Sequence, residues 1–115
     1  MNRAFLIGRV DSTPELKVTP GGDVFLRLRM VTRERWNDRG TGEVREETVH
    51  HTVLFSGPRA EALVQTLQAG DRVGVEGRIA YRRPDDSRRN LVRVDIRANA
   101  IHLLGARSGR VAEAG

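Results

Sequence analysis

The chain has 115 residues, a formal net charge of +5 and no cysteine, and this length suits a single domain. Without cysteine it forms neither disulfides nor cysteine-based zinc sites, and no apolar run approaches the ~20 residues that span a bilayer. The apolar stretch at the N-terminus is too short for a signal peptide, so we expect a cytoplasmic protein. The positive charge, carried by arginine everywhere except Lys17, favours a polyanionic partner.

The first half of the chain predicts strands separated by turns. The stretch Phe5–Ile7, followed by Gly8, predicts a buried strand, and Thr13–Val18 predicts a second one that the turn Pro20–Gly22 closes. From Val24 to Thr32 apolar and polar residues alternate, which is typical of a strand. One face of this strand carries Val24, Leu26, Leu28 and Met30, and the other carries Phe25, Arg27, Arg29, Val31 and Arg33.

A long polar segment, residues 33–47, contains Trp36 and the turn signal Asp38–Gly42. Strands flank it on both sides, so we expect an extended hairpin tip with Trp36 in a polar loop. The following strand, Thr48–Phe55, places on one face Val49, His51, Val53 and Phe55.

One helix is predicted next, opened by Ser56–Pro58 with proline in its first turn. Gly70 lies where a C-terminal cap is expected. The apolar stripe that packs on the barrel consists of Ala60, Leu63, Val64 and Leu67.

Two further strands end the pattern. One alternates through Val73, Val75, Gly77, Ile79 and Tyr81, and a second polar hairpin tip follows at residues 82–90. The last strand alternates through Val92, Val94, Ile96 and Ala98, and is extended by Ile101, Leu103 and Leu104.

This order of elements, with one helix between the fourth and fifth strands, is that of an all-β OB-fold. Such a fold is a five-stranded Greek-key barrel with β-hairpin loops, and its second and third strands bind nucleic acids. We expect the barrel domain to span residues 1–105 and residues 106–115 to form a short flexible tail.

The histidines and paired carboxylates do not predict chemistry. His50 and His51 are adjacent and point to opposite faces of a strand, so they cannot share a metal ion. Asp85–Asp86 and Glu46–Glu47 lie in polar segments, where carboxylates are usually solvated rather than catalytic. We expect no metal, no cofactor and no enzymatic activity; the enzyme alternative is a nuclease.

Short motifs follow one another in order along the chain. They are MNRAFLIGRV at 1–10, TPELKVTPGG at 13–22, TRERW at 32–36, VLF at 53–55, LQAG at 67–70, VEGRI at 75–79 and LLG at 103–105. Each motif is short, but the ordered set is specific and resembles bacterial single-stranded DNA-binding proteins over nearly the whole chain.

The resemblance implies an OB-fold, usually a homotetramer, that wraps single-stranded DNA during replication, repair and recombination, in the cytoplasm and with the nucleoid. It implies base stacking at the positions of Trp36 and Phe55, and a subunit interface at His50. Basic positions near the DNA path are matched by Arg3, Arg82 and Arg83. We therefore expect two partners, single-stranded DNA and further copies of the chain, as a tetramer or a dimer, and no membrane.

The chain departs from the family pattern at several positions. Val49 and Pro84 stand where the family often has tryptophan, Thr66 where it often has tyrosine, and His51 where it has a basic residue. The missing rings lead us to expect weaker stacking. The acidic C-terminal tip is absent from 111–115, so we expect no recruitment of proteins by that route. With these departures, the chain resembles a paralogue, a shortened form or a phage or plasmid relative of the family.

The candidate DNA-binding residues are Arg3, Arg27, Arg29, Arg33, Arg35, Trp36, His51, Phe55, Tyr81, Arg82 and Arg83. Guanidinium planes contact phosphates and stack on bases, so arginines compensate for missing rings. The alternative interpretations are a solvated strand face for the arginines, a clip onto the barrel for Trp36, core packing for Phe55 and Tyr81, and a structural role for His50. The alternative function is a primosome-type OB-fold adaptor that acts mainly through protein partners.

Overall fold

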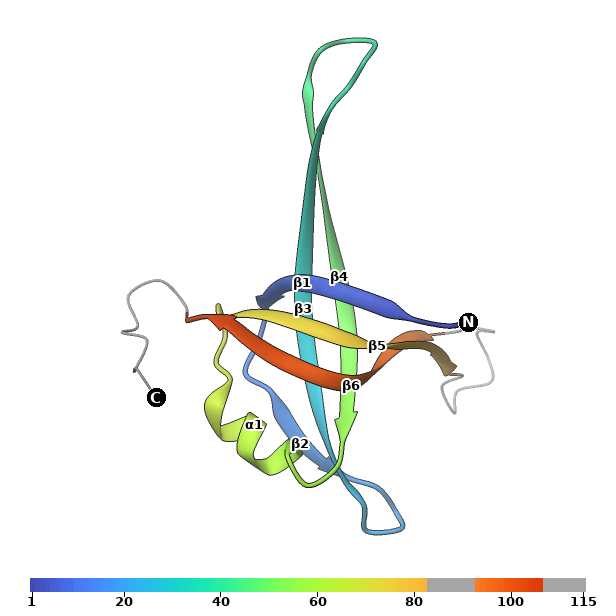
Figure 1. The fold of residues 1–115 in the computed structure, drawn as a ribbon, viewed down its shortest axis with the longest axis vertical. Helices are drawn as coiled ribbons and strands as arrows, with labels where there is room; N and C mark the ends of the chain where they lie inside the picture. The colour runs from blue at the N-terminus through green and yellow to red at the C-terminus, as the bar shows by residue number, and fades with distance from the viewer. Residues whose placement is uncertain (83–92, 107–115) are drawn as a thin grey trace.

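The computed structural model describes residues 1–82 and 93–106 (Figure 1). They form β1 (Ala4–Val10), β2 (Glu15–Val18), β3 (Val24–Asn37), β4 (Val44–Ser56), α1 (Ala60–Thr66), β5 (Arg72–Arg82) and β6 (Arg93–Gly105). This is the expected order, with the helix between the fourth and fifth strands. Most of the second hairpin tip, including Arg83 and Pro84, and the tail from residue 107 onward lie outside the described residues.

The strands close into a five-stranded barrel, as the sequence predicts for an OB-fold. Hydrogen bonds join the strands in the order β1-β5-β6-β4-β3, and a further β1–β3 pairing completes the circuit. The short strand β2 pairs with β3 outside this circuit. Figure 1 shows β1, β5 and β6 crossing β3 and β4 steeply, with α1 against one end of the barrel.

The core follows from the alternation in each strand. Fully buried side chains include Leu26, Leu28, Met30, Val53, Val73 and Val75. Phe55 and Val53 of β4 lie opposite Leu26 and Leu28 of β3, so the predicted apolar faces of these two strands meet. Ala60 and Leu67, from the predicted helix stripe, join the same core cluster.

Two glycines permit the barrel to close. A Cβ added at Gly8 would overlap the carbonyl oxygen of Val31, and one at Gly77 would overlap that of Arg97. Gly77 also follows directly on a register shift in the β5–β6 ladder. Backbones approach here too closely for any side chain, which is a recognised reason for glycine inside a strand.

The β3–β4 hairpin extends well beyond the barrel (Figure 1). Paired residues continue as far as Asn37 and Val44, so the polar segment expected as a hairpin tip from residue 33 to 47 is mostly strand. Trp36 therefore lies in β3 and not in a loop, which corrects the expectation. The reason is that polar residues satisfy the backbone ladder as well as apolar ones where both faces meet water.

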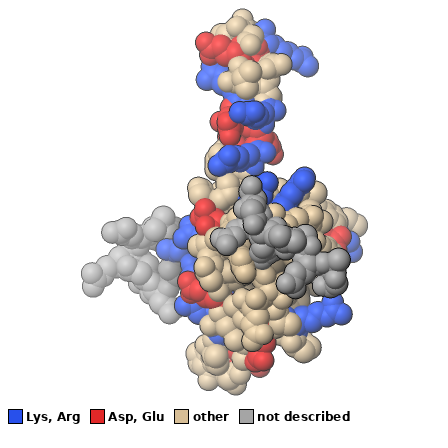
Figure 2. All heavy atoms as spheres, turned by 90° about the vertical axis from the view of Figure 1, so that its left-hand side faces the viewer, with Lys and Arg blue, Asp and Glu red and all other residues tan. Residues whose placement is uncertain are grey.

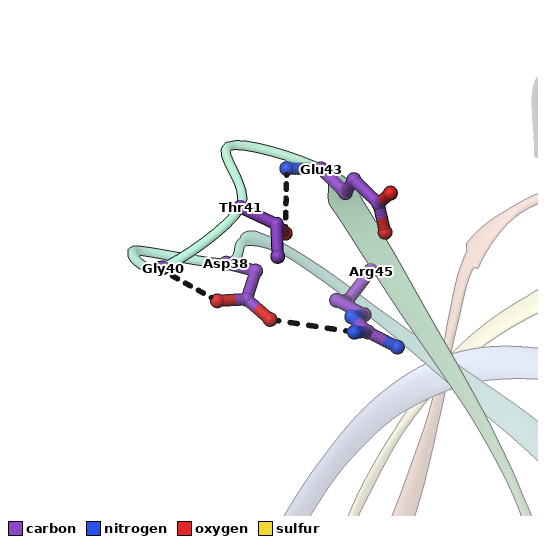
Figure 3. A network of polar contacts seen from close by, with 5 residues as sticks. All are labelled: Asp38, Gly40, Thr41, Glu43 and Arg45. Carbon is purple, nitrogen blue, oxygen red and sulfur yellow. Dashed lines mark hydrogen bonds and ion pairs between the residues drawn. The ribbon is translucent and has the colours of Figure 1, made fainter.

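The hairpin turn is held by its own polar side chains (Figure 3). The Asp38 carboxylate accepts a hydrogen bond from the Gly40 N–H at 2.8 Å and pairs with Arg45 at 3.4 Å. The Thr41 hydroxyl accepts a hydrogen bond from the Glu43 N–H at 3.2 Å. Such side-chain contacts to the backbone favour a fixed turn and therefore a fixed register between the two strands.

Two other expectations are wrong in detail. The first strand is not buried, because alternate residues of β1 point outward, and Phe5 and Ile7 are 62% and 60% exposed. The helix ends at Thr66, so Gly70 is not its C-terminal cap. Gly70 instead adopts a positive φ of 92° in the turn before β5, where its N–H donates to the carbonyl of Val10 at 2.8 Å.

Candidate nucleic-acid interface

Arginines from three strands share the outer surface of the barrel. Arg27 of β3 lies opposite Leu54 of β4. Leu54 lies opposite Arg97 of β6, which lies opposite Arg78 of β5. Residues paired in this way project from the same face of a sheet, so alternate positions extend the set. The resulting surface, called the arginine face below, consists of Arg27, Arg29, Arg78, Arg82, Arg93 and Arg97.

The positive charge of the arginine face is largely uncompensated. Asp95 of β6 is buried and accepts a hydrogen bond from Arg82 Nε at 3.0 Å, and Glu76 of β5 lies 3.5 Å from His102 Nε2. Glu15, opposite Arg27, pairs instead with Lys17 at 2.9 Å, and the hydrogen bond and charge of Lys17 lower the pKa of Glu15. Within the described residues, Arg29, Arg78 and Arg97 have no carboxylate within 4.0 Å.

An open groove of about 450 Å³ lies at one end of the arginine face. Its lining is Thr19, Phe25, Leu54, Ser56, Arg78, Arg97, Ala98 and Asn99. The half-buried ring of Phe25 and the side chain of Leu54 supply apolar surface, and Arg78 and Arg97 supply charge. Flat apolar surface beside cations is the combination that holds unpaired bases and their phosphates.

Trp36 lies on the projecting hairpin, directly opposite Arg45. Successive residues of a strand face opposite sides, so Trp36 projects from one face of the hairpin and Arg33 and Arg35 from the other. The Trp36 residue is 47% exposed, which leaves its ring accessible. Figure 2 shows Lys and Arg alternating with Asp and Glu along the hairpin, and one such pair joins Arg35 to Glu46 at 3.6 Å.

The two remaining aromatic candidates have opposite environments. Phe55 is 8% exposed and belongs to the core, because the apolar face of β4 points inward there, which agrees with the core-packing alternative. Tyr81 is 74% exposed, because β5 continues beyond the core, and the core alternative for this residue is therefore wrong. Tyr81 lies opposite Val94, which is also exposed.

The neighbouring histidines differ in the same way. His51 lies opposite Met30, is half-buried, and its Nε2 is 2.8 Å from the Thr32 hydroxyl. Burial, and secondarily the charge of His50, lower the pKa of His51, so it is neutral at pH 7 and does not fit a phosphate-binding cation. His50 is on the outer face, with Nδ1 3.8 Å from an Asp11 carboxylate oxygen.

The other predicted cations are spread over the surface. Arg33 and Arg35 lie on the hairpin beyond Arg27 and Arg29 and continue the same strand face. Arg3 lies just before β1 and is exposed. The Asn2 side chain bonds the N–H and carbonyl of Ile79 at 3.0 and 2.7 Å, which holds the segment with Arg3 alongside β5.

Sequence reasoning missed part of this surface. Arg78, Arg93 and Arg97 alternate with the apolar positions of their strands, but the predicted DNA-binding set does not include them. The alternation was a usable signal, because it already separated these residues from the core. The missing information was the pairing of β6 with β4, a parallel contact between strands far apart in the sequence.

The described residues hold no group of three or more His, Cys, Asp or Glu side chains arranged for a metal ion. None of their helices is long and apolar enough to cross a membrane.

Comparison with known proteins gives a consistent result. The Single-strand binding protein family matches residues 1–104. The single-stranded DNA binding protein of Thermus aquaticus is 33% identical, with a TM-score of 0.79 over 93% of this chain and 52% of its own. The SSB of Plasmodium falciparum, in complex with ssDNA, is 29% identical, with a TM-score of 0.79 over 92% and 95% of the two chains.

A small single-stranded DNA-binding protein of Streptomyces coelicolor is 26% identical, with a TM-score of 0.69 over 88% of this chain and 92% of its own. The chain thus spans about half the length of the Thermus aquaticus protein and nearly the full length of the other two.

Proposed function

Since this chain belongs to the single-strand binding protein family, we propose that it binds single-stranded DNA through the arginine face and the ring of Trp36. The observation that carries the proposal is the gathering of arginines from three strands beside a groove that the ring of Phe25 lines. The Plasmodium falciparum relative in complex with ssDNA supports the same ligand.

The mechanism needs no base-specific contact. Guanidinium groups neutralise phosphates and release condensed counterions, so affinity falls as salt rises. Stacking on Trp36, Tyr81 and Phe25 accepts any base, because every base has a flat π-face. Binding of this kind has little sequence preference and leaves the strand intact, so we infer a protective role during replication, repair or recombination, in the cytoplasm with the nucleoid.

The chain also has a surface suited to a second copy. Phe5 and Ile7 of β1 and Leu104 of β6 are exposed, and contiguous exposed apolar residues are typical of protein interfaces. The pairing of β1, β5 and β6 brings these side chains to one outer face. We infer a homotetramer or dimer with His50 at a subunit contact, which light scattering distinguishes; an Ile7→Glu variant should lower the molar mass.

Titration of labelled oligo(dT) tests the DNA-binding proposal. Trp36 is the only tryptophan, so its fluorescence reports on one position. We expect quenching of Trp36 together with rising anisotropy of the oligonucleotide, and much weaker binding of a duplex with matched length. No binding at low salt, or equal affinity for duplex and single strand, would contradict the proposal.

A further inference from the structure

A second concave site lies beside the middle of β3, away from the groove that Phe25 lines. It has a volume of about 500 Å³ between β1, β3 and β5. Its lining is Ile7, Gly8, Arg9, Val10, Asp11, Val31, Arg33, Gly70 and Arg72. Arg33 is eight residues beyond Phe25, about 26 Å along an extended strand, so the two sites are distinct.

The strand pairings explain why three arginines meet at this site. Arg9 lies opposite Arg72 on β5 and opposite Val31 on β3. Arg33 is two residues beyond Val31 and therefore projects from the same face. Figure 2 shows basic side chains gathered where the hairpin joins the barrel. The site, called the arginine pocket below, thus draws one cation from each of the three strands.

Charge in the arginine pocket is unbalanced. Three guanidinium groups face one carboxylate, Asp11, which leaves a formal excess of two positive charges. Asp11 itself is 3.8 Å from His50. In the described part of the chain, neither Arg33 nor Arg72 has a carboxylate within 4.0 Å. Like charges opposite each other, as in the Arg9–Arg72 pair, destabilise a sheet unless something compensates them.

The backbone fixes one of the three arginines in place. Arg9 Nη1 donates a hydrogen bond to the carbonyl of Gly70 at 2.9 Å. Gly70 has a positive φ, and it is tied to the same strand by its own hydrogen bond to Val10. Two glycines, Gly8 and Gly70, line the pocket without side chains to fill it. The pocket is therefore partly ordered before any ligand arrives, which lowers the cost of binding.

We propose that the arginine pocket binds a phosphate monoester dianion. Guanidinium forks match phosphate oxygens, and a phosphate monoester carries about −1.5 to −2 charges at pH 7, which balances the excess of two. The dianion is either the terminal phosphate of a DNA strand or that of a free nucleotide. Only the first source rests on the proposed function. A phosphodiester within a strand carries one charge and complements the pocket less well.

The experiment compares three proteins: wild type, Arg33→Gln/Arg72→Gln and the control Arg59→Gln. Arg59 is exposed and is not among the residues that line the pocket. One arm measures binding of thymidine monophosphate by calorimetry. The other compares oligo(dT) carrying a 5′-phosphate, a 3′-phosphate or only hydroxyl ends. Thermal melting checks that the double variant folds, and Arg33→Gln alone serves if Arg72→Gln impairs folding.

We expect the wild type to bind the mononucleotide or to prefer one phosphorylated end. Each guanidinium removed should weaken that binding by about tenfold or more, whereas Arg59→Gln should leave it unchanged. Binding of thymidine monophosphate would identify a free nucleotide as the ligand. A preference for one phosphorylated end, without mononucleotide binding, would identify the terminal phosphate of a DNA strand. The proposal is overturned if the wild type binds neither, or if Arg59→Gln causes an equal loss.

The two arms separate this inference from the proposed function. If the hydroxyl-ended oligonucleotide binds tightly and a terminal phosphate does not change its affinity, phosphate binding by the arginine pocket is rejected and the proposed function is retained. Arginine-dependent mononucleotide binding without oligonucleotide binding does the reverse.

Discussion

Arg97 of β6 lies directly opposite Arg78 of β5 on the outer surface of the barrel, and in the described chain neither has a carboxylate within 4.0 Å. Facing like charges cost a sheet roughly 0.2–1 kcal/mol. The pair therefore opposes folding slightly, and an anion such as a DNA phosphate would reverse that effect.

The first prediction concerns this pair. Arg78→Gln and Arg97→Gln should each weaken oligo(dT) binding and reduce the slope of log K against log salt by about 0.7, the value for one phosphate on a single strand. The thermal midpoint should stay equal or rise slightly, because the repulsion is removed. The matched control, Arg59→Gln, removes the same charge from a site outside the arginine face, and an equal loss there would argue against a specific contact.

The second prediction concerns Trp36. Trp36→Ala should weaken oligo(dT) binding by about 1–3 kcal/mol, the contribution of one base stacked on an aromatic ring. Trp36→Phe should retain much of the affinity, since it keeps a flat ring. Anisotropy titrations of all three proteins measure the difference. Equal affinities for the wild type and Trp36→Ala would show that the ring is solvated rather than stacked.

The third prediction concerns barrel closure. Gly8→Ala and Gly77→Ala should each destabilise the fold by about 1–3 kcal/mol, because the new Cβ overlaps a backbone carbonyl. One kcal/mol corresponds to about 4–8 °C in the melting temperature for a small domain. Gly21→Ala is the control, since its Cβ would meet no atom closer than 3.9 Å. Melting curves that leave all three variants alike would contradict the closure described above.

The fourth prediction concerns pH. Burial lowers the pKa of His51 below its ordinary value of 6.5, so at mildly acidic pH the folded state binds fewer protons than the unfolded state. Its contribution to stability is complete above pH about 6.5 and is lost as pH falls through the folded-state pKa. Urea unfolding measures the free energy of unfolding at about pH 7 and about pH 5. Between these pH values it should fall less for His51→Gln than for the wild type.

All other side chains are the same in the two proteins, so the difference between them reports on position 51. An equal loss of stability in wild type and variant would mean that the ring is not shielded in the folded state.

Much of the fold could be predicted from the sequence because alternation is a local signal. Leu26, Leu28 and Met30 recur at every second position, and all three are buried in β3. The helix stripe Ala60 to Leu67 was equally readable. By contrast, the exposure of Phe5 and Ile7 depends on which side of β1 the rest of the barrel covers, which no local pattern in β1 reveals.

The site could be predicted only in part. Arg27 and Arg29 were identified because they share one strand, but Arg78 and Arg97 join them through pairings between distant strands. Phe55 and Tyr81 both occupy the apolar positions of their strands, yet one is buried and the other exposed. The difference is where each strand leaves the barrel, and that depends on the length of its partners.

Hydrogen–deuterium exchange with and without oligo(dT) tests the DNA-binding surface most directly. We predict slower exchange, on adding the oligonucleotide, in segments 24–36, 44–56, 78–82 and 93–99, which carry the arginine face and the hairpin. Segment 4–10, which is strand β1, should change little. Protection confined to β1, with β3, β4 and β6 unaffected, would contradict the assignment of single-stranded DNA to the arginine face.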